Sequence, residues 1–508
     1  MRNGVRGALA GVAAAAVALG LAEFVAVFTG ARSAPLVAVG GVVVDHVPEP
    51  LKQFAIDTFG THDKTALLTG TVVLLAAFAA LIGWLGLRNI WYGVAGIAIF
   101  GVVGIAAALT RPDAGLSAAV PSLLGAAVAG LVLTRLLRRP QAADPSDSAR
   151  APDPGDRRRF LTGVAVVVGA AAASGLGGRW LSTRRTVSEA RRAVRLPAPA
   201  SPAPAVPAGA ELNITQLEPY VTSNRAFYRI DTALVVPQVD PVSWTLKIHG
   251  RVRNPITLTF DQLMARPMVE RYVTLACVSN EVGGDLIGNA RWLGVPVKEL
   301  LDEAQPLPGA DQVVGRSADG WTCGTPTDVL RDGRDALLAV GMNGEPLPVQ
   351  HGFPARIVVP GLYGYVSACK WVVELELTSF ADFDAYWVPR GWSAQGPIKT
   401  QSRIDTPRRS NNLTAGPLTV AGVAWAQHRG ISKVEVRVDG GPWQEAMLAR
   451  SVSIDTWTQW SWRWDATPGR HRLQVRATDA TGEVQTDERR PPDPDGATGW
   501  HSVDVEVG

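Results

Sequence analysis

Cys277 stands where a β-prone run opens into a polar, glycine-rich stretch. Residues 271–276 favour a strand, and the stretch that follows runs to the pair Arg291–Trp292, after which we expect an amphipathic helix. A thiol at the end of a strand is held rigidly and stays reachable, and loops on a rigid scaffold are where binding and catalytic groups concentrate. The ordinary alternative is a small buried thiol without a chemical role.

Three further stretches of the same region contain side chains that bind anions or metals. One precedes an expected strand, one is rich in glycine and aromatic residues, and one is a polar–aromatic cluster early in the domain. Their polar members are Asn224, Tyr228, His351, Arg356, Ser367 and Lys370. Arginine offers paired donors to a phosphate, lysine a point charge, and glycine loops their backbone amides. Together with one thiol, this set predicts a soft-metal ligand inside an anion-binding pocket.

A cysteine–histidine hydrolase is the competing interpretation, since a thiolate near a histidine can act as a nucleophile. Hydrolysis gives no reason for a basic phosphate cradle. The three cysteines, Cys277, Cys323 and Cys369, do not make a disulfide framework. We expect Cys323 and Cys369 to be independent buried thiols, with a bridge between them as the alternative. A net charge of +3 over 508 residues predicts no nucleic-acid partner.

The residue pattern around these groups predicts strands and short helices, and together they indicate a mixed α+β domain over residues 213–400. Expected strands are residues 244–252, 256–259, 356–359 and 370–377, and expected helices are residues 260–265 and 297–304. Strands and short helices are interspersed without a regular βαβ period. Neither a GxGxxG nor a Walker-type loop is present, which argues against a nucleotide-binding fold.

Residues 401–508 have an all-β pattern. Short strands are expected at residues 418–425, 431–438, 460–464, 472–478 and 502–507, with glycine-containing turns at residues 439–441 and 480–482. Trp460, Trp462 and Trp464 alternate along one of these strands and therefore point to one face, where we expect a core. About 100 residues of this kind predict an immunoglobulin-like β-sandwich.

Residues 1–195 contain five apolar runs about as long as a membrane-crossing helix requires. They are residues 7–30, 66–87, 90–110, 116–137 and 160–178. A shorter run, residues 35–47, is expected to be re-entrant or interfacial. Four clusters of arginine flank the five runs so that all four lie on one side, which is the cytoplasmic side under the positive-inside rule. This membrane domain then leaves the rest of the chain on the extracytoplasmic face of the plasma membrane.

The run Arg157-Arg158-Arg159-Phe160-Leu161 resembles a twin-arginine export signal, placed here inside the chain. The arginines that follow the fifth run would lie on the outer side, against the positive-inside rule. The twin-arginine route carries folded proteins, and a basic flank obstructs it less. An ordinary positive-inside anchor is the alternative, and it predicts the same topology. No histidine lies within the five runs, so we expect an anchor or docking platform and not a membrane haem. Residues 196–212 are rich in Pro and Ala and are expected to form a semi-rigid linker.

Four stretches, in order, resemble the sulfite oxidase family of molybdenum enzymes. They are Cys277 with its loop and residues 288–292, 342–348 and 351–361. The resemblance covers residues 213–400, and the C-terminal sandwich is similar to that family's dimerisation domain. It implies a molybdenum bound by one molybdopterin and by the Cys277 thiolate, with oxygen-atom transfer as the reaction. It also implies pterin or phosphate contacts from Asn224, Tyr228, Arg291, His351, Arg356, Ser367 and Lys370.

Three positions depart from the family's pattern. Ser223 and Val282 stand where sulfite oxidases have arginines, and Trp392 stands where a tyrosine is expected. An anionic substrate would lose charge-assisted hydrogen bonds worth roughly 1.5–3 kcal/mol each. We therefore expect a membrane-anchored enzyme that transfers oxygen to or from a small, sulfur-containing substrate. It would use an unidentified electron carrier, and the sandwich offers a route to a homodimer. The alternatives are a sulfoxide reductase fed by membrane electrons and a non-catalytic membrane receptor or scaffold that keeps the fold.

Overall fold

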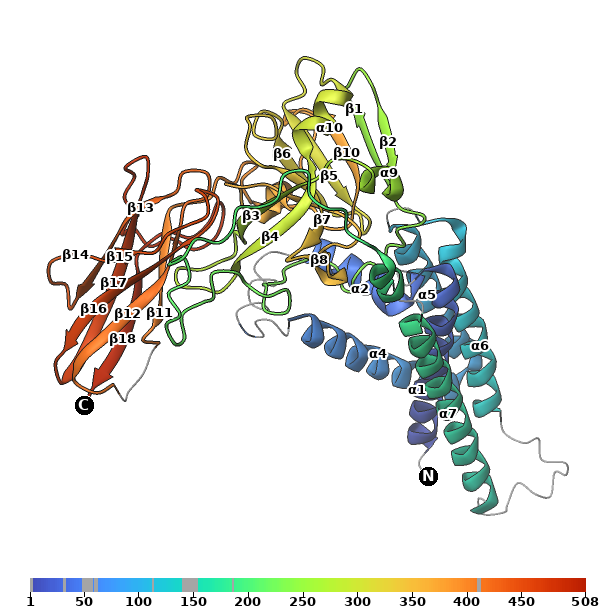
Figure 1. Cartoon of the computed structure of the whole chain (residues 1–508). Coiled ribbons are helices and arrows are strands. Elements are labelled where there is room, and N and C mark those ends of the chain that lie inside the picture. The colour runs from blue at the N-terminus through green and yellow to red at the C-terminus, as the bar shows by residue number, and fades with distance from the viewer. Residues whose placement is uncertain are drawn as a thin grey trace, which may run out of the picture. The chain divides into compact units, whose positions relative to one another are not determined.

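The computed structural model describes residues 3–30, 33–47, 58, 63–111, 114–138, 154–184, 187–408 and 413–508. The chain forms two compact units (Figure 1). The first consists of Met1–Thr186 with Ala233–Val236, and the second of Val187–Thr232 with Pro237–Gly508. The second unit contains the residues that the sequence singled out for chemistry.

The first unit is helical. Its elements are α1 (Asn3–Thr29), α2 (Pro35–His46), α4 (Asp63–Arg88), α5 (Ile90–Leu109), the 3-10 turn η3 (Leu116–Ala119), α6 (Val120–Leu137) and α7 (Pro154–Arg184). Among the residues that the structure describes, five helices are long and apolar enough to cross a membrane, judged by length and composition, and they coincide with the five predicted runs. Small residues let α1 approach its neighbours closely: a Cβ on Gly11 would lie 1.9 Å from the Ala79 carbonyl oxygen of α4.

Two sheets form the centre of the second unit, as the predicted mixed α+β domain requires. One has the order β2-β1-β10-β5-β6, and the other the order β3-β4-β7-β8 with β9 paired to β7. The first sheet consists of β1 (Thr245–Gly250), β2 (Ile256–Thr259), β5 (Gln312–Ser317), β6 (Thr322–Pro326) and β10 (Val372–Thr378). The second consists of β3 (Val269–Ala276), β4 (Ile287–Pro296), β7 (Leu337–Met342), β8 (Glu345–Pro346) and β9 (Arg356–Val358).

Short helices and turns connect and cover these sheets. They are α8 (Ser188–Ala193), α9 (Phe260–Met264), α10 (Val297–Ala304), η5 (Val349–His351), α11 (Gly364–Ser367) and η6 (Val388–Arg390). Thr259 and Gln262 form a capping box at the start of α9, which explains why a five-residue helix begins there. The apolar face of α10 packs into the core through Val297, Leu300, Leu301 and Ala304.

The structure corrects the prediction for the residues after Cys277. The glycine-rich loop ends at Leu286, and Ile287–Pro296 forms β4. The pair Arg291–Trp292 therefore lies within a strand, and the helix α10 begins only after it. Pairing with β3 on one side and β7 on the other satisfies the backbone of this segment, and such non-local pairing leaves no mark in the local sequence.

The Pro/Ala tract was predicted to be a spacer, and the structure shows it packed on the second unit. Ser201 pairs with Val269 in a parallel bridge, and its carbonyl oxygen accepts a hydrogen bond of 2.8 Å from the Glu270 backbone nitrogen. Further along, the Leu212 backbone nitrogen donates to Gln459 Oε1 at 2.8 Å. A proline-rich segment can occupy a sheet edge because the edge does not need every donor of the added strand.

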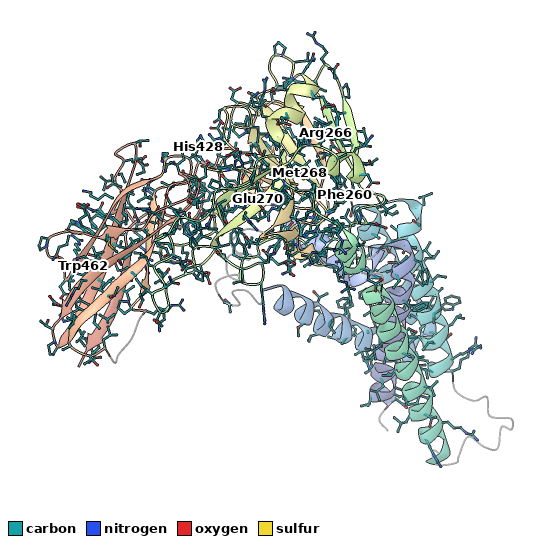
Figure 2. The ribbon with its side chains drawn as sticks, viewed as in Figure 1. Phe260, Arg266, Met268, Glu270, His428 and Trp462 are labelled. Carbon is teal, nitrogen blue, oxygen red and sulfur yellow. The ribbon has the colours of Figure 1, made fainter. Side chains whose placement is uncertain are left out.

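The C-terminal part of the second unit is a sandwich of two four-stranded sheets, ordered β11-β12-β16-β15 and β14-β13-β17-β18. Its strands are β11 (Gln401–Thr406), β12 (Gly416–Trp425), β13 (Ile431–Val438), β14 (Gln444–Glu445), β15 (Met447–Leu448), β16 (Thr458–Ala466), β17 (Gly469–Asp479) and β18 (His501–Val507). Trp460 and Trp464 are buried in its core and Trp462 packs against it (Figure 2), as the alternation predicts. The immunoglobulin-like prediction is confirmed.

Hydrogen bonds join the sandwich to the strand that leads to Cys277. Gln427 Nε2 donates to the Thr274 carbonyl oxygen at 2.9 Å, and the Trp457 backbone nitrogen donates to Thr274 Oγ1 at 2.8 Å. The Thr274 backbone nitrogen in turn donates to the Asp455 carbonyl oxygen at 2.9 Å. β3 is therefore held by β4 along one edge and by sandwich loops at its C-terminal end.

Candidate functional site

Cys277 begins a loop that closes on itself. The Cys277 backbone nitrogen donates to the Leu286 carbonyl oxygen at 2.9 Å, and the Leu286 backbone nitrogen donates to Asn280 Oδ1 at 2.8 Å. The Asn280 backbone nitrogen donates to the Cys277 carbonyl oxygen at 3.1 Å. These three bonds fix the direction of the Cys277 side chain, which is 8% exposed.

The surroundings of the Cys277 thiol combine burial with hydrogen-bond donors. Burial raises the pKa of this thiol, while the Ser279 backbone N–H and hydroxyl, the positive charge of Lys370 and the Val278 backbone N–H act in the opposite direction. The loop therefore supplies hydrogen-bond donors to the Cys277 sulfur, and Lys370 acts on that sulfur electrostatically. A thiol in such a place is deprotonated when it binds a metal cation.

Two buried cations belong to the same cluster. Lys370 Nζ donates to Asp231 Oδ2 at 3.0 Å and to the Ile230 carbonyl oxygen at 3.1 Å, and burial lowers the pKa of Lys370 to about 8. The Arg356 guanidinium lies 5.0 Å above the Trp292 ring and donates to the His351 carbonyl oxygen at 3.1 Å. Burial lowers the pKa of Arg356 to about 10. Both side chains thus carry positive charge at neutral pH inside the protein.

Gly352 allows the His351 turn to lie against Lys370. Its φ is +112°, and a Cβ at this position would lie 3.2 Å from the Lys370 Cα. A side chain here would be strained by the backbone angle and crowded by the neighbouring main chain. Two segments that lead to strands of different sheets, β9 and β10, are therefore brought together at one glycine.

His351 and Tyr228 contribute neutral polar groups to the cluster. His351 Nε2 lies 3.0 Å from the Asn224 carbonyl oxygen, so Nε2 carries the ring proton and Nδ1 is left as an acceptor. Burial, with the nearby Arg356, lowers the pKa of His351 to about 4. Tyr228 stacks on Phe227 at 5.1 Å, and burial, with the nearby Cys277 thiolate, raises the pKa of its hydroxyl above the usual range.

Two of the predicted residues, Asn224 and Ser367, do not direct their side-chain polar groups into the cluster but take part in hydrogen bonds with main-chain atoms. The Asn224 amide donates to Glu345 Oε1 at 2.6 Å and its oxygen accepts from Asn343 Nδ2 at 2.8 Å, so it is the Asn224 main chain that meets His351. Ser367, fully buried in α11, donates its hydroxyl hydrogen to the Tyr363 carbonyl oxygen at 2.9 Å. In this structure both side chains brace the loops around the cluster.

Arg291 does not join the cluster. It precedes Trp292 on β4, and successive side chains of a strand point to opposite faces. Trp292 packs under Arg356, whereas Arg291 forms an ion pair of 3.2 Å with Glu270 of β3. The expectation that Arg291 contacts a cofactor came from the family resemblance. In this structure the strand places its side chain on the face of the sheet opposite to that of Trp292.

Four residues near the cluster were missed by the sequence reasoning, namely Arg229, Asp231, Ser279 and Tyr363. Asp231 pairs with both Lys370 and Arg229, Ser279 donates to the Cys277 thiolate, and the Tyr363 hydroxyl lies within electrostatic range of that thiolate. Asp231 had a detectable signal, because it is an acid three residues after Tyr228 in an otherwise basic and aromatic segment. The part played by Tyr363 depends on the fold and had no local signal.

Cys323 and Cys369 are both free and buried, as predicted, but they are not independent. Their side chains meet beside Gly315, and burial together with the hydrogen bond that Cys369 donates to Cys323 raises the pKa of the Cys369 thiol. Among the described residues, no group of three or more His, Cys, Asp or Glu side chains is arranged to hold a metal ion.

The three departures from the family's pattern lie on loops. Ser223 is exposed, and Val282 is half-buried in the loop that follows Cys277. Trp392 is part of an aromatic group, with ring centroids 6.0 Å from Trp387 and 5.9 Å from Tyr365. The positions that carry arginines in sulfite oxidases thus hold a small hydroxyl and an aliphatic side chain.

Comparison with known proteins identifies both parts of the second unit. The family described as "Oxidoreductase molybdopterin binding domain" matches residues 233–387, and "Bacterial Ig domain" matches residues 401–475. The latter match supports an immunoglobulin-like domain and does not test the expected resemblance of the sandwich to a dimerisation domain.

Three relatives illustrate the range of similarity. Human mitochondrial sulfite oxidase is 29% identical over 319 residues, which cover 53% of this chain and 58% of the relative. The catalytic subunit of the protein-methionine-sulfoxide reductase MsrP from Burkholderia mallei is 31% identical over 282 residues, covering 50% of this chain and 78% of the relative. The crystal structure of the sulfane dehydrogenase SoxCD from Paracoccus pantotrophus has a TM-score of 0.50 at 25% identity, covering 57% of this chain and 84% of that chain.

Proposed function

Because the chain belongs to the sulfite oxidase family of molybdopterin-dependent oxidoreductases, we propose that it transfers an oxygen atom to or from a small, sulfur-containing substrate. It is an oxidoreductase with a molybdenum–molybdopterin cofactor. The chain spans 58% of the length of human sulfite oxidase, so the substrate and the electron partner are proposals drawn from the site.

The observation that carries the proposal is the convergence of Cys277, Tyr228, His351, Arg356 and Lys370 from separate segments. Each lies within electrostatic range of at least one other member: Tyr228 of Cys277 and Arg356, Lys370 of Cys277, and His351 of Arg356 and Lys370. A hydrolase would need an imidazole that accepts a proton from the thiol. Here the ring is buried and its pKa is far below neutral, which gives the hydrolase alternative no support.

The donor set fits the cofactor. The Cys277 thiolate would bind the molybdenum, with the Ser279 and Val278 donors stabilising its charge. Arg356 and Lys370 would hold the anionic phosphate. Lys370 shares the carboxylate of Asp231 with Arg229, and Arg356 donates to the His351 carbonyl oxygen, so positive charge is left for a ligand. The Tyr228 hydroxyl, which remains protonated, and His351 Nδ1 would offer one donor and one acceptor to the pterin. Asn224 and Ser367 would act by bracing these groups.

When bound, the cofactor supplies the two-electron change and the exchange of an oxygen atom, while the protein supplies orientation and electrostatics. The closed loop of Cys277 holds the thiolate in one direction, and burial of the cluster excludes water from the protein side of the site. Arg356, stacked on Trp292, and Lys370, paired with Asp231, keep their charges in fixed positions.

A sulfoxide reductase is the second candidate, and the substrate side of the loop favours it. Ser223 and Val282 provide no charge to hold a dianion such as sulfite, and the aromatic group of Tyr365, Trp387 and Trp392 suits a neutral, partly apolar substrate. The similarity to the MsrP catalytic subunit supports the same direction. The non-catalytic receptor or scaffold has no observation in its favour, and the match to a molybdopterin-binding oxidoreductase domain supports an enzyme.

We further propose that the five apolar helices anchor the enzyme in the plasma membrane with its catalytic domain on the extracytoplasmic face. Their length and composition support this topology, as do the arginines at their ends. Export through the twin-arginine route would allow cofactor insertion before translocation; the side chain of Arg157 lies outside the described residues. A separate electron carrier and a homodimer through the sandwich remain part of the proposal.

Metal analysis of the purified full chain tests the proposal. About one molybdenum per chain is expected, with its loss in Cys277→Ser and its retention in the control Cys323→Ala. Sulfite oxidation and sulfoxide reduction would then be assayed on the same preparation with artificial electron acceptors and donors. A correctly exported protein without molybdenum, or equal molybdenum in Cys277→Ser and the wild type, would refute the assignment.

A further inference from the structure

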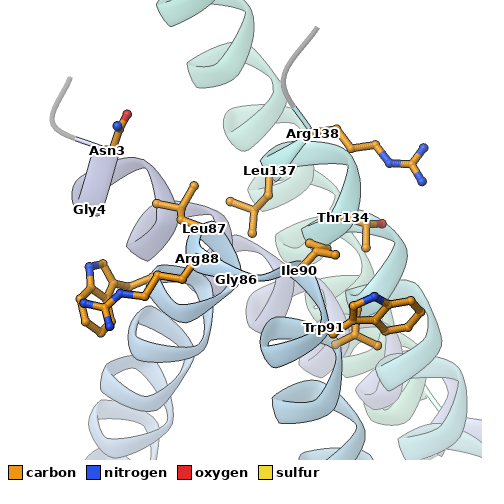
Figure 3. A pocket seen from close by; sticks show the side chains of 12 residues that line it. Asn3, Gly4, Gly86, Leu87, Arg88, Ile90, Trp91, Thr134, Leu137 and Arg138 are labelled. Atoms are coloured by element: carbon orange, nitrogen blue, oxygen red, sulfur yellow. The ribbon is translucent and has the colours of Figure 1, made fainter. Parts of the chain in front are cut away.

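A cavity of about 700 Å³ lies at one end of the helical unit, where α4 and α6 end and α1 and α5 begin. Its inner wall is apolar and includes Leu87, Ile90 and Leu137. Figure 3 shows Arg88 extending from the end of α4 on one side of the pocket, and Arg138 at the end of α6 and Trp91 on the other side. The cavity thus combines an apolar interior with a cationic and aromatic rim.

The two guanidiniums leave their charge available for a ligand. Arg88 stacks over the Trp84 ring at 4.1 Å, a geometry that fixes the plane of the guanidinium and leaves its N–H edge open. Arg138 is exposed at its helix end. No carboxylate is among the residues that line the cavity, and neither arginine forms an ion pair with a described carboxylate. The site therefore attracts anions.

The apolar wall of the cavity and the apolar helix faces around it indicate an anion with hydrocarbon chains. Trp91 is 71% exposed at the start of α5, as expected for a side chain in the interfacial belt of a membrane helix. Outward-facing apolar side chains, such as Leu81 and Leu131, continue along the same helices. A second cavity of about 630 Å³ on α6 and α7 is lined by Arg135, Arg158 and Arg159 with apolar residues, again without a carboxylate. Both cavities involve the C-terminal half of α6.

We propose that the Arg88–Arg138 cavity binds the phosphate headgroup of an anionic phospholipid, with the acyl chains lying along the apolar helix faces. Basic pockets between membrane helices on the cytoplasmic side are suited to such headgroups. The site rests on the membrane crossing proposed above and is separate from the molybdenum site. The arginines at this end of the bundle would then bind a lipid headgroup in addition to setting the topology of the helices.

The test uses the full chain in detergent micelles, titrated with phosphatidylglycerol or phosphatidylcholine of identical acyl chains and followed by native mass spectrometry. Phosphatidylglycerol is expected to bind at least tenfold more tightly. Arg88→Gln/Arg138→Gln is expected to weaken that binding about thirtyfold, since each arginine near the headgroup contributes about a factor of five. Arg463→Gln/Arg470→Gln, which removes the same charge from exposed positions of the sandwich, leaves it unchanged.

Three results would overturn the proposal. They are equal binding of the two lipids, an Arg88→Gln/Arg138→Gln variant that binds like the wild type, and a loss of the same size in the sandwich control. Displacement of phosphatidylglycerol by millimolar inorganic phosphate would assign the site to a free anion instead. Arg88→Lys/Arg138→Lys, which keeps the charge, guards against a folding defect: it must retain the preference for phosphatidylglycerol.

Discussion

The Arg403 guanidinium donates a hydrogen bond of 2.7 Å to the Gly284 carbonyl oxygen, which ties the first strand of the sandwich to the loop that follows Cys277. Arg403 is itself held by Asp405, which accepts from its Nε at 2.6 Å, and both side chains are buried. The sandwich therefore positions the Cys277 loop from outside the cluster.

Arg403→Met is expected to loosen this loop and to destabilise the protein. The substitution leaves Asp405 buried without its cation, a change that costs roughly 3–5 kcal/mol. The thermal midpoint and the molybdenum content per chain should both fall. Arg470→Met, at an exposed position of the same domain, serves as the control. Molybdenum retention equal to that of the control would show that the contact does not position the loop.

Lys370 makes the insertion of the cofactor sensitive to pH. Its pKa of about 8 means that the side chain loses its positive charge as the pH rises from 7 to 9. The affinity of the apo-chain for the anionic cofactor should therefore fall in this window, by at most about tenfold per pH unit. Reconstitution of apo-protein at a series of pH values measures the effect. Lys370→Arg keeps its charge and should abolish the decline; an unchanged decline in that variant would contradict the role.

His351 is expected to make the protein less stable in acid. Its folded-state pKa of about 4 lies below the ordinary value of 6.5, so the unfolded chain binds more protons between these values. Stability is therefore full above pH 6.5 and is lost as the pH falls towards 4, by about 3 kcal/mol in all. His351→Gln should flatten the fall of the thermal midpoint over this range.

His471→Gln is the matched control for that experiment. Asp439 raises the pKa of His471, so this histidine stabilises the folded state at low pH and loses that effect as the pH rises. Its removal should slightly steepen the loss in acid, the opposite of His351→Gln. Identical profiles for the two variants would rule out the assignment to His351.

Val282→Arg is expected to improve the use of sulfite. A guanidinium in the Cys277 loop would restore one charge-assisted hydrogen bond to a dianion, worth roughly 1.5–3 kcal/mol. The KM for sulfite should fall about tenfold or more, while the KM for a neutral sulfoxide should not improve. Val282→Gln, which is long but neutral, separates charge from size. Equal effects of the two substitutions would argue against electrostatic discrimination at this position.

The elements that depend on local pattern were predictable. Alternation of apolar residues located β1 and β13 to within two residues, and the five apolar runs match five long helices. Cys277 was placed correctly at the end of a strand, because β-prone residues precede it and glycines follow. In each case the information lies in the pattern of neighbouring side chains along the chain.

Tertiary pairing decided the rest. Arg291 is directed away from Arg356 only because Ile287–Pro296 pairs with both β3 and β7, whereas the polar and glycine residues before this segment had suggested a loop. Likewise, the Pro/Ala tract looks like a spacer until Ser201 meets the edge of β3.

The sequence by itself determined the chemistry on offer, which is one thiol at a strand end among groups that bind anions. Only the tertiary structure decided which of those groups share its surroundings. Asn224 reaches His351 through its backbone, Lys370 is held by Asp231, and Arg403 reaches the Cys277 loop from another domain. Such partners lie about 120 to 140 positions apart in the sequence, as the first two pairs show. No local periodicity records them, because they depend on how distant strands pair and pack.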